Sequence, residues 1–169
     1  MKKNIPNFIT ITRILGTIAM SFTTALTKPF FVLYTYSGFS DVLDGFIARK
    51  YHWTSELGSK LDGASDLIFY TVMMTKIMPY LREKLPVLVW IYIAIILLLR
   101  VSLYIFHFIK TNSFLSQHTI FNKATGLLMF GIPYMLETNV FIIYAHVVCI
   151  VAFIAVIYEL YLEYKQFNG

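Results

Sequence analysis

Long apolar runs constrain this chain more than any other feature. Of its 169 residues, 58% are hydrophobic and only 14% are charged, whereas roughly 25% are charged in an ordinary soluble domain. A helix needs about 20 apolar residues to cross the hydrocarbon of a bilayer. Backbone groups in lipid must be bonded within their own segment, so the runs predict helices. The six expected spans are residues 8–26, 29–49, 57–80, 86–108, 121–136 and 140–162.

The six spans predict an all-α integral membrane protein, with a single domain over residues 1–169. An even number of spans places both termini on the same side of the membrane. Basic residues are more frequent on that side, which includes Lys2, Lys3 and the 49–60 loop. Because cytoplasmic loops are enriched in Lys and Arg, we expect both termini in the cytoplasm. Residues 1–7 are expected to form an interfacial segment.

The formal net charge of +5 does not indicate a nucleic-acid-binding protein. The basic residues flank apolar runs, so anionic lipid headgroups are their expected partners and no nucleic acid is expected. Cys149 is the single cysteine of the chain. An intrachain disulfide and a cysteine metal site are therefore excluded.

Four aspartates stand near the facing ends of the second and third predicted spans. Asp41 and Asp44 are three residues apart, and Asp62 and Asp66 are four apart, so each pair shares one helix face. A short loop joins the two spans, and we therefore expect the two acidic faces to point at each other. Small residues fall on the same faces, at Gly45, Ala48 and Gly58.

Carboxylates gathered in a region of low dielectric repel one another and need cations. Ligand sets made of oxygen alone suit hard divalent ions, and two ions bridged by shared carboxylates promote displacement at phosphorus. The alternative is a structural role, in which the acids cap helices or pair with Arg49, Lys50 and Lys60. Since acids within membrane spans are usually functional, we expect a phosphate-bearing ligand held through metals at the cytoplasmic surface.

The pattern Asp-x2-Asp-Gly-x2-Ala-Arg-x8-Gly-x3-Asp-x3-Asp, residues 41–66, resembles the signature of the CDP-alcohol phosphotransferase (phosphatidyltransferase) family. The resemblance implies transfer of a phosphatidyl group from CDP-diacylglycerol to a small alcohol, with release of CMP. It also implies a homodimer, two divalent ions (Mg²⁺ or Mn²⁺), and Asp66 as the general base. The implied metal ligands are Asp41, Asp44, Asp62 and Asp66, and the implied donor-binding residues are Gly45, Ala48, Arg49 and Gly58.

The N-terminal stretch NIPNFITITRI, residues 4–14, resembles the start of bacterial phosphatidylglycerophosphate synthases. That resemblance implies glycerol 3-phosphate as the acceptor, with Thr10 and Arg13 near the mouth of the active site. A cap at the helix start and a snorkelling Arg13 are the structural alternative. Gly63 and Leu67 depart from that subfamily, which commonly has proline and lysine there. Acceptors of the phosphatidylserine or phosphatidylinositol-phosphate type therefore stay open.

Two further cations, Arg100 and Lys123, are candidates for binding a phosphorylated acceptor. Arg100 lies within the fourth span, where an arginine needs a partner or a water-filled cavity. Pairing of Arg100 with an acid and interfacial anchoring of Lys123 are the structural alternatives. We expect Glu159 and Glu163 to face the cytoplasmic interface.

The resemblance places the protein in the bacterial cytoplasmic membrane, with its active site facing the cytoplasm. Two other functions also use clustered acids. Intramembrane prenyltransferases bind a diphosphate through aspartates and Mg²⁺, but their chains are longer and their motifs are spaced differently. A divalent-cation carrier typically shows broken helices or inverted repeats near the midplane, and no repeat is visible in this sequence.

Overall fold

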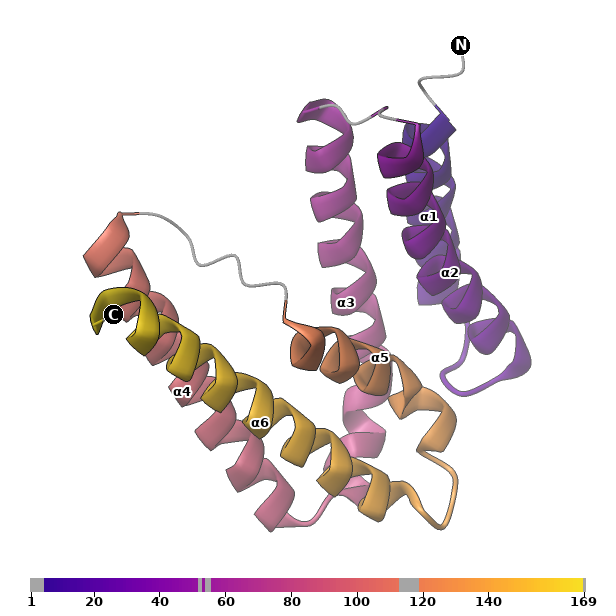
Figure 1. Ribbon diagram of the computed structural model, residues 1–169. Coiled ribbons are helices and arrows are strands. Elements are labelled where there is room, and N and C mark those ends of the chain that lie inside the picture. Colours follow the sequence, from indigo (N-terminus) through magenta and orange to yellow (C-terminus); the bar gives the residue numbers. More distant parts are fainter. Residues whose placement is uncertain (1–4, 52, 54–55, 113–118, 169) are drawn as a thin grey trace. The chain divides into compact units, whose positions relative to one another are not determined.

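The computed structural model describes residues 5–51, 53, 56–112 and 119–168. All regular structure in these ranges is helical (Figure 1). The helices are α1 (Ile5–Ser21), α2 (Lys28–Lys50), α3 (Glu56–Lys84), α4 (Val87–Thr111), α5 (Ile120–Met135) and α6 (Phe141–Asn168). The expected helical segments are thus confirmed. The contacts divide the chain into two compact units, Met1–Tyr80 and Leu81–Gly169.

The ends of two helices have a clear local cause. The first helix ends at Ser21, earlier than predicted, and the amides of Phe22 and Thr23 donate to carbonyls three residues back, at 3.1 Å each. This tightened turn ends the helix. At the end of α4, Asn112 takes a left-handed φ of 52° and its N–H donates to the carbonyl of Phe108 at 2.8 Å, as at many helix C-termini.

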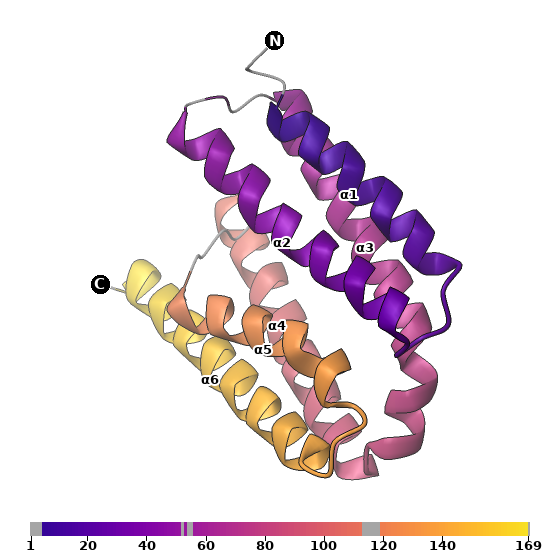
Figure 2. The same ribbon diagram turned by 90° about the vertical axis from the view of Figure 1, so that its right-hand side faces the viewer.

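In the first unit, α1 packs mainly against α2. Figure 2 shows α1, α2 and α3 running alongside one another, and the buried residues change from apolar to polar along these helices. Stacked aromatic rings on α2 and α3 fill the apolar part, with the centroids of Tyr34 and Phe69 5.4 Å apart. The polar part lies toward the start of α1, the end of α2 and the start of α3. The buried residues are Thr10, Arg13, Thr17 and Met20 on α1, Phe30, Tyr34, Ser37, Ser40 and Asp44 on α2, and Ser65, Phe69, Met73 and Ile77 on α3.

In the second unit, α4 and α6 are long and apolar enough to cross a membrane. The most apolar 18-residue stretches of Val87–Thr111 and Phe141–Lys165 have mean hydropathies of 2.4 and 2.6. Only 11% and 28% of their most apolar stretches are buried within the protein. The core helix of a soluble protein would bury most of its apolar surface, so lipid is the expected surrounding of these two helices. Both helices therefore indicate a membrane location.

A buried polar network connects α4, α5 and α6. The Nη2 of Arg100 donates to Oδ1 of Asn122 at 2.8 Å and lies 3.6 Å from Oε2 of Glu159. The amide of Asn122 also donates to Glu159. Closer to the helix ends, Nδ1 of His107 lies 2.6 Å from Oε1 of Glu163.

Glu159 and Glu163 are only 1% and 2% exposed, so the expectation that they face the aqueous interface is wrong. Both carboxylates point into the unit, where Arg100 and His107 of α4 lie beside them. Within the described part of the chain, Nε of Arg100 and Oε2 of Glu159 are buried without a hydrogen bond. The ion pair at 3.6 Å and the hydrogen bonds of both side chains to Asn122 together compensate for the loss of water.

We predict that Arg100→Ala lowers the stability of the protein in detergent by about 1–3 kcal/mol, because it leaves the buried Glu159 without its cation. Lys123→Ala removes an exposed charge and should cost less than about 0.5 kcal/mol. Thermal unfolding followed by circular dichroism measures both. The double variant Arg100→Leu/Glu159→Leu should regain most of the loss, since both charges are removed together. Equal losses for Arg100→Ala and Lys123→Ala would contradict the structural role of Arg100.

Candidate functional site

Three carboxylates converge in the polar part of the first unit. Asp41 comes from α2, and Asp62 and Asp66 come from successive turns of α3. One oxygen of each lies within 4.8 Å of the others. The side chains are 46%, 46% and 45% exposed, so an ion or ligand can reach them. A set of three carboxylate oxygens at this spacing fits a hard divalent cation. We call these three residues the acidic cluster.

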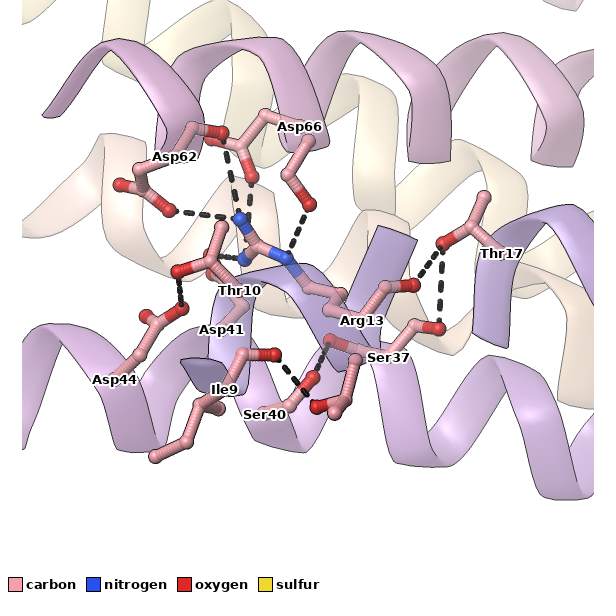
Figure 3. Close-up of polar contacts among 12 residues, drawn as sticks. Ile9, Thr10, Arg13, Thr17, Ser37, Ser40, Asp41, Asp44, Asp62 and Asp66 are labelled. Atoms are coloured by element: carbon pink, nitrogen blue, oxygen red, sulfur yellow. Dashed lines mark hydrogen bonds and ion pairs between the residues drawn. The ribbon is translucent and has the colours of Figure 1, made fainter. Parts of the chain in front are cut away.

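The guanidinium of Arg13, from α1, lies among these acids (Figure 3). Its Nη1 pairs with Asp41 and lies 3.5 Å from Oδ1 of Asp66, while its Nη2 lies 2.7 Å from Oδ1 of Asp62. Its Nε donates to Oγ of Ser65 at 2.6 Å. The side chain is only 1% exposed. One buried cation thus holds together acids that would otherwise repel one another.

Contacts between α1 and α2 fix the position of Arg13. The hydroxyl of Thr17 donates to the carbonyl of Arg13 at 2.9 Å and lies 3.4 Å from the hydroxyl of Ser37. One residue earlier, Gly16 faces the ring of Tyr36, and a Cβ at this glycine would come within 3.3 Å of that ring. The absence of a side chain at Gly16 therefore lets α1 approach α2 closely.

Asp44 is set apart from the acidic cluster. It is only 4% exposed, and its Oδ2 accepts a hydrogen bond from the hydroxyl of Thr10 at 2.8 Å. Thr10 lies one turn before Arg13 on α1, so one face of α1 provides a partner for each of the four predicted aspartates. The family resemblance implies that Asp44 is a metal ligand together with the other three acids, whereas in the structure a hydroxyl holds it.

The remaining predicted site residues are divided between the two units. Gly45 lies on α2 and Gly58 on α3, next to the acids in sequence. The side chains of Ala48 and Arg49 lie outside the described part of the chain. Arg100 and Lys123 belong to the second unit, where Arg100 pairs with Glu159. Lys123 is exposed in the first turn of α5.

Sequence reasoning missed the direct contact of Arg13 with three acids and the contribution of Ser65. One signal was available for Arg13, because Thr10, Arg13 and Thr17 recur at helical spacing and form a polar stripe on an apolar segment. A buried arginine in such a segment requires acidic partners. Nothing in the sequence distinguishes Ser65 from the other hydroxyl residues of the chain.

Comparison with known protein sequences identifies a family for this chain. The chain matches the sequence model of the CDP-alcohol phosphatidyltransferase family over residues 3–158. A protein of Schizosaccharomyces pombe, a cardiolipin synthase (CMP-forming) / mitochondrial hydrolase fusion protein, is 34% identical over 84 residues. The match covers 48% of this chain and 14% of that relative. No solved structure matches. Because the family match extends over nearly the whole chain and includes all four aspartates, this chain belongs to the CDP-alcohol phosphatidyltransferase family.

Proposed function

We propose that the protein transfers a phosphatidyl group from CDP-diacylglycerol to an alcohol acceptor and releases CMP. The observation that carries this proposal is the convergence of Asp41, Asp62 and Asp66, whose oxygens lie within 4.8 Å of one another. Membership of the CDP-alcohol phosphatidyltransferase family gives the class of donor. Neither a prenyltransferase nor a cation carrier receives comparable support.

The four aspartates provide ligands for two divalent ions, Mg²⁺ or Mn²⁺. When bound, such ions would neutralise the negative charge of the donor diphosphate. In the proposed site Asp41, Asp44, Asp62 and Asp66 would hold these ions, and Thr10 would orient the carboxylate of Asp44 through its Oδ2. The donor nucleotide lies against Gly45, Ala48, Arg49 and Gly58, near the end of α2 and the start of α3.

Asp66 is the proposed general base. Of the three acids in the cluster, it makes the longest contact with Arg13, 3.5 Å against 2.7 Å for Asp62. Its side chain is 45% exposed. The carboxylate of Asp66 is therefore the least engaged by Arg13 and can accept the proton of an approaching hydroxyl. Asp41 and Asp62, which are held more tightly, serve as fixed ligands.

The proposed membrane arrangement has six spans, both termini in the cytoplasm, and one domain over residues 1–169. Its support is the length and apolarity of α4 and α6. The acids lie six to ten residues from the end of α2 or the start of α3, which is about 9–15 Å along the helix axis at 1.5 Å per residue. In the proposed arrangement the donor's acyl chains stay in lipid and its diphosphate reaches the acids from the cytoplasmic side. We also propose a homodimer in a bacterial cytoplasmic membrane.

Glycerol 3-phosphate is the proposed acceptor, and its support is the N-terminal stretch at residues 4–14. Of the four proposed acceptor-binding residues, Thr10, Arg13 and Arg100 each contact an acid of their own unit, and the side chain of Lys123 is exposed. Of these four side chains, that of Lys123 is thus the one without an acidic partner among the described residues.

A second acceptor, phosphatidylglycerol, is favoured by the match to a CMP-forming cardiolipin synthase. Cardiolipin carries two phosphatidyl groups on one glycerol, so forming it with release of CMP requires phosphatidylglycerol to attack the CDP-linked donor. Both acceptors present a glycerol hydroxyl to phosphorus.

We predict that Asp66→Asn lowers the turnover number at least 100-fold, because an amide cannot accept the proton of the acceptor. The release of CMP from CDP-diacylglycerol measures turnover, and thermal unfolding in detergent checks the fold. Glu83→Gln is the matched control, because it removes an exposed acid from the same helix. Normal turnover by Asp66→Asn would exclude Asp66 as the base.

The acceptor is identified by mass spectrometry of the lipid products. Purified protein with CDP-diacylglycerol and Mg²⁺ is offered glycerol 3-phosphate, phosphatidylglycerol, serine and inositol phosphate in separate reactions. We expect phosphatidylglycerophosphate from glycerol 3-phosphate. Cardiolipin as the main product would establish the second candidate instead. A product from serine or inositol phosphate alone would contradict both.

A further inference from the structure

The place of Arg13 has a consequence for ion binding. We propose that Arg13 is an internal counter-cation of the acidic cluster that competes with divalent ions, and thereby sets the affinity of the site for metal. The inference rests on the proposed function, because it takes the acidic cluster as the metal site. It assigns Arg13 a different role from the binding of an acceptor phosphate.

The contacts show that Arg13 uses the same carboxylates that a metal ion would need. Each acid of the cluster turns its Oδ1 toward a terminal nitrogen of this guanidinium. A cation that binds all three acids must lie next to the guanidinium or take its place. In either position the two positive charges repel each other, and the low exposure of Arg13 means that little water screens the repulsion.

Arg13 cannot avoid this repulsion by losing its proton, because a guanidinium stays charged in proteins. It is also restrained from swinging away. Its Nε is held by Ser65 at 2.6 Å, and the side chain is only 1% exposed. The guanidinium therefore remains among the acids whether or not an ion is bound, and its charge opposes every ion that enters.

In the protein without metal, the same contacts make Arg13 stabilising. Three acids within 4.8 Å of one another need a neighbouring cation. When Arg13 is replaced by a neutral residue, the metal-free protein should become less stable and an added divalent ion should restore more stability than it does in the wild type. If Arg13 only packed α1 against its neighbours, its replacement would lower the stability without increasing the gain from an added ion.

The test is a titration of the purified full chain in detergent with Mn²⁺ alone, followed by electron paramagnetic resonance of the free ion. We expect Arg13→Gln to bind Mn²⁺ at least tenfold more tightly than the wild type. The matched control is Arg100→Gln, which neutralises a part-buried arginine that is also paired with an acid but lies outside the acidic cluster. This control should bind Mn²⁺ within twofold of the wild type, although it too is destabilised.

Thermal unfolding provides the second readout. Without metal, Arg13→Gln should unfold at a lower temperature than the wild type, and saturating Mn²⁺ should raise its midpoint by more than it raises that of the wild type. If Arg13→Gln does not fold, Arg13→Lys keeps the charge but contacts fewer of the acids at once. Arg13→Lys should bind Mn²⁺ more tightly than the wild type, but by less than tenfold.

Mn²⁺ affinity that is unchanged or weakened in the folded Arg13 variants would overturn the competition. Absence of Mn²⁺ binding in every protein, wild type included, would overturn the competition together with the metal site. Tighter Mn²⁺ binding by Arg13→Gln, combined with no CMP release by the wild type with any acceptor, would support the role of Arg13 and contradict the proposed function.

Discussion

The gathering of negative charge inside a largely apolar protein is the constraint on which the first unit depends. Asp41, Asp62 and Asp66 lie close enough for their oxygens to share one ion, and at this separation they repel each other strongly. Arg13 compensates for this charge from a third helix. Its position requires α1 to approach the other two helices closely, and Gly16 and the hydroxyl contacts of Thr17 make that approach possible.

The second unit also contains buried carboxylates, but their charge is compensated differently. Its helices expose large apolar side chains, as expected against lipid, and α6 keeps Glu159 and Glu163 inside. Each of these two acids has a basic residue of α4 as its partner, with Arg100 beside Glu159 and His107 beside Glu163. One basic residue thus lies beside each acid, and the two pairs hold α4 and α6 together. The acidic cluster has three acids around one arginine, and this excess of negative charge makes it the better candidate for binding cations.

The sequence predicts the helices and the acidic pairs well, because both depend on spacing along one helix. Asp41 with Asp44 and Asp62 with Asp66 could be placed on shared faces from their separations alone. The rotation of each helix about its axis depends on packing between helices, which no local spacing contains. For that reason the separation of Asp44 from the other acids was not foreseen. The burial of Glu159 was missed for the same reason, since its partner Arg100 lies 59 positions earlier in the chain.

The central claim is that the acidic cluster binds divalent cations. Its most direct test is a crystal structure of the protein grown with Mn²⁺ and measured at the manganese absorption edge. We expect anomalous density within about 2.0–2.3 Å of carboxylate oxygens of Asp41, Asp62 and Asp66. Ordered density for these three side chains without an anomalous peak between them, at a saturating concentration of Mn²⁺, would contradict the claim.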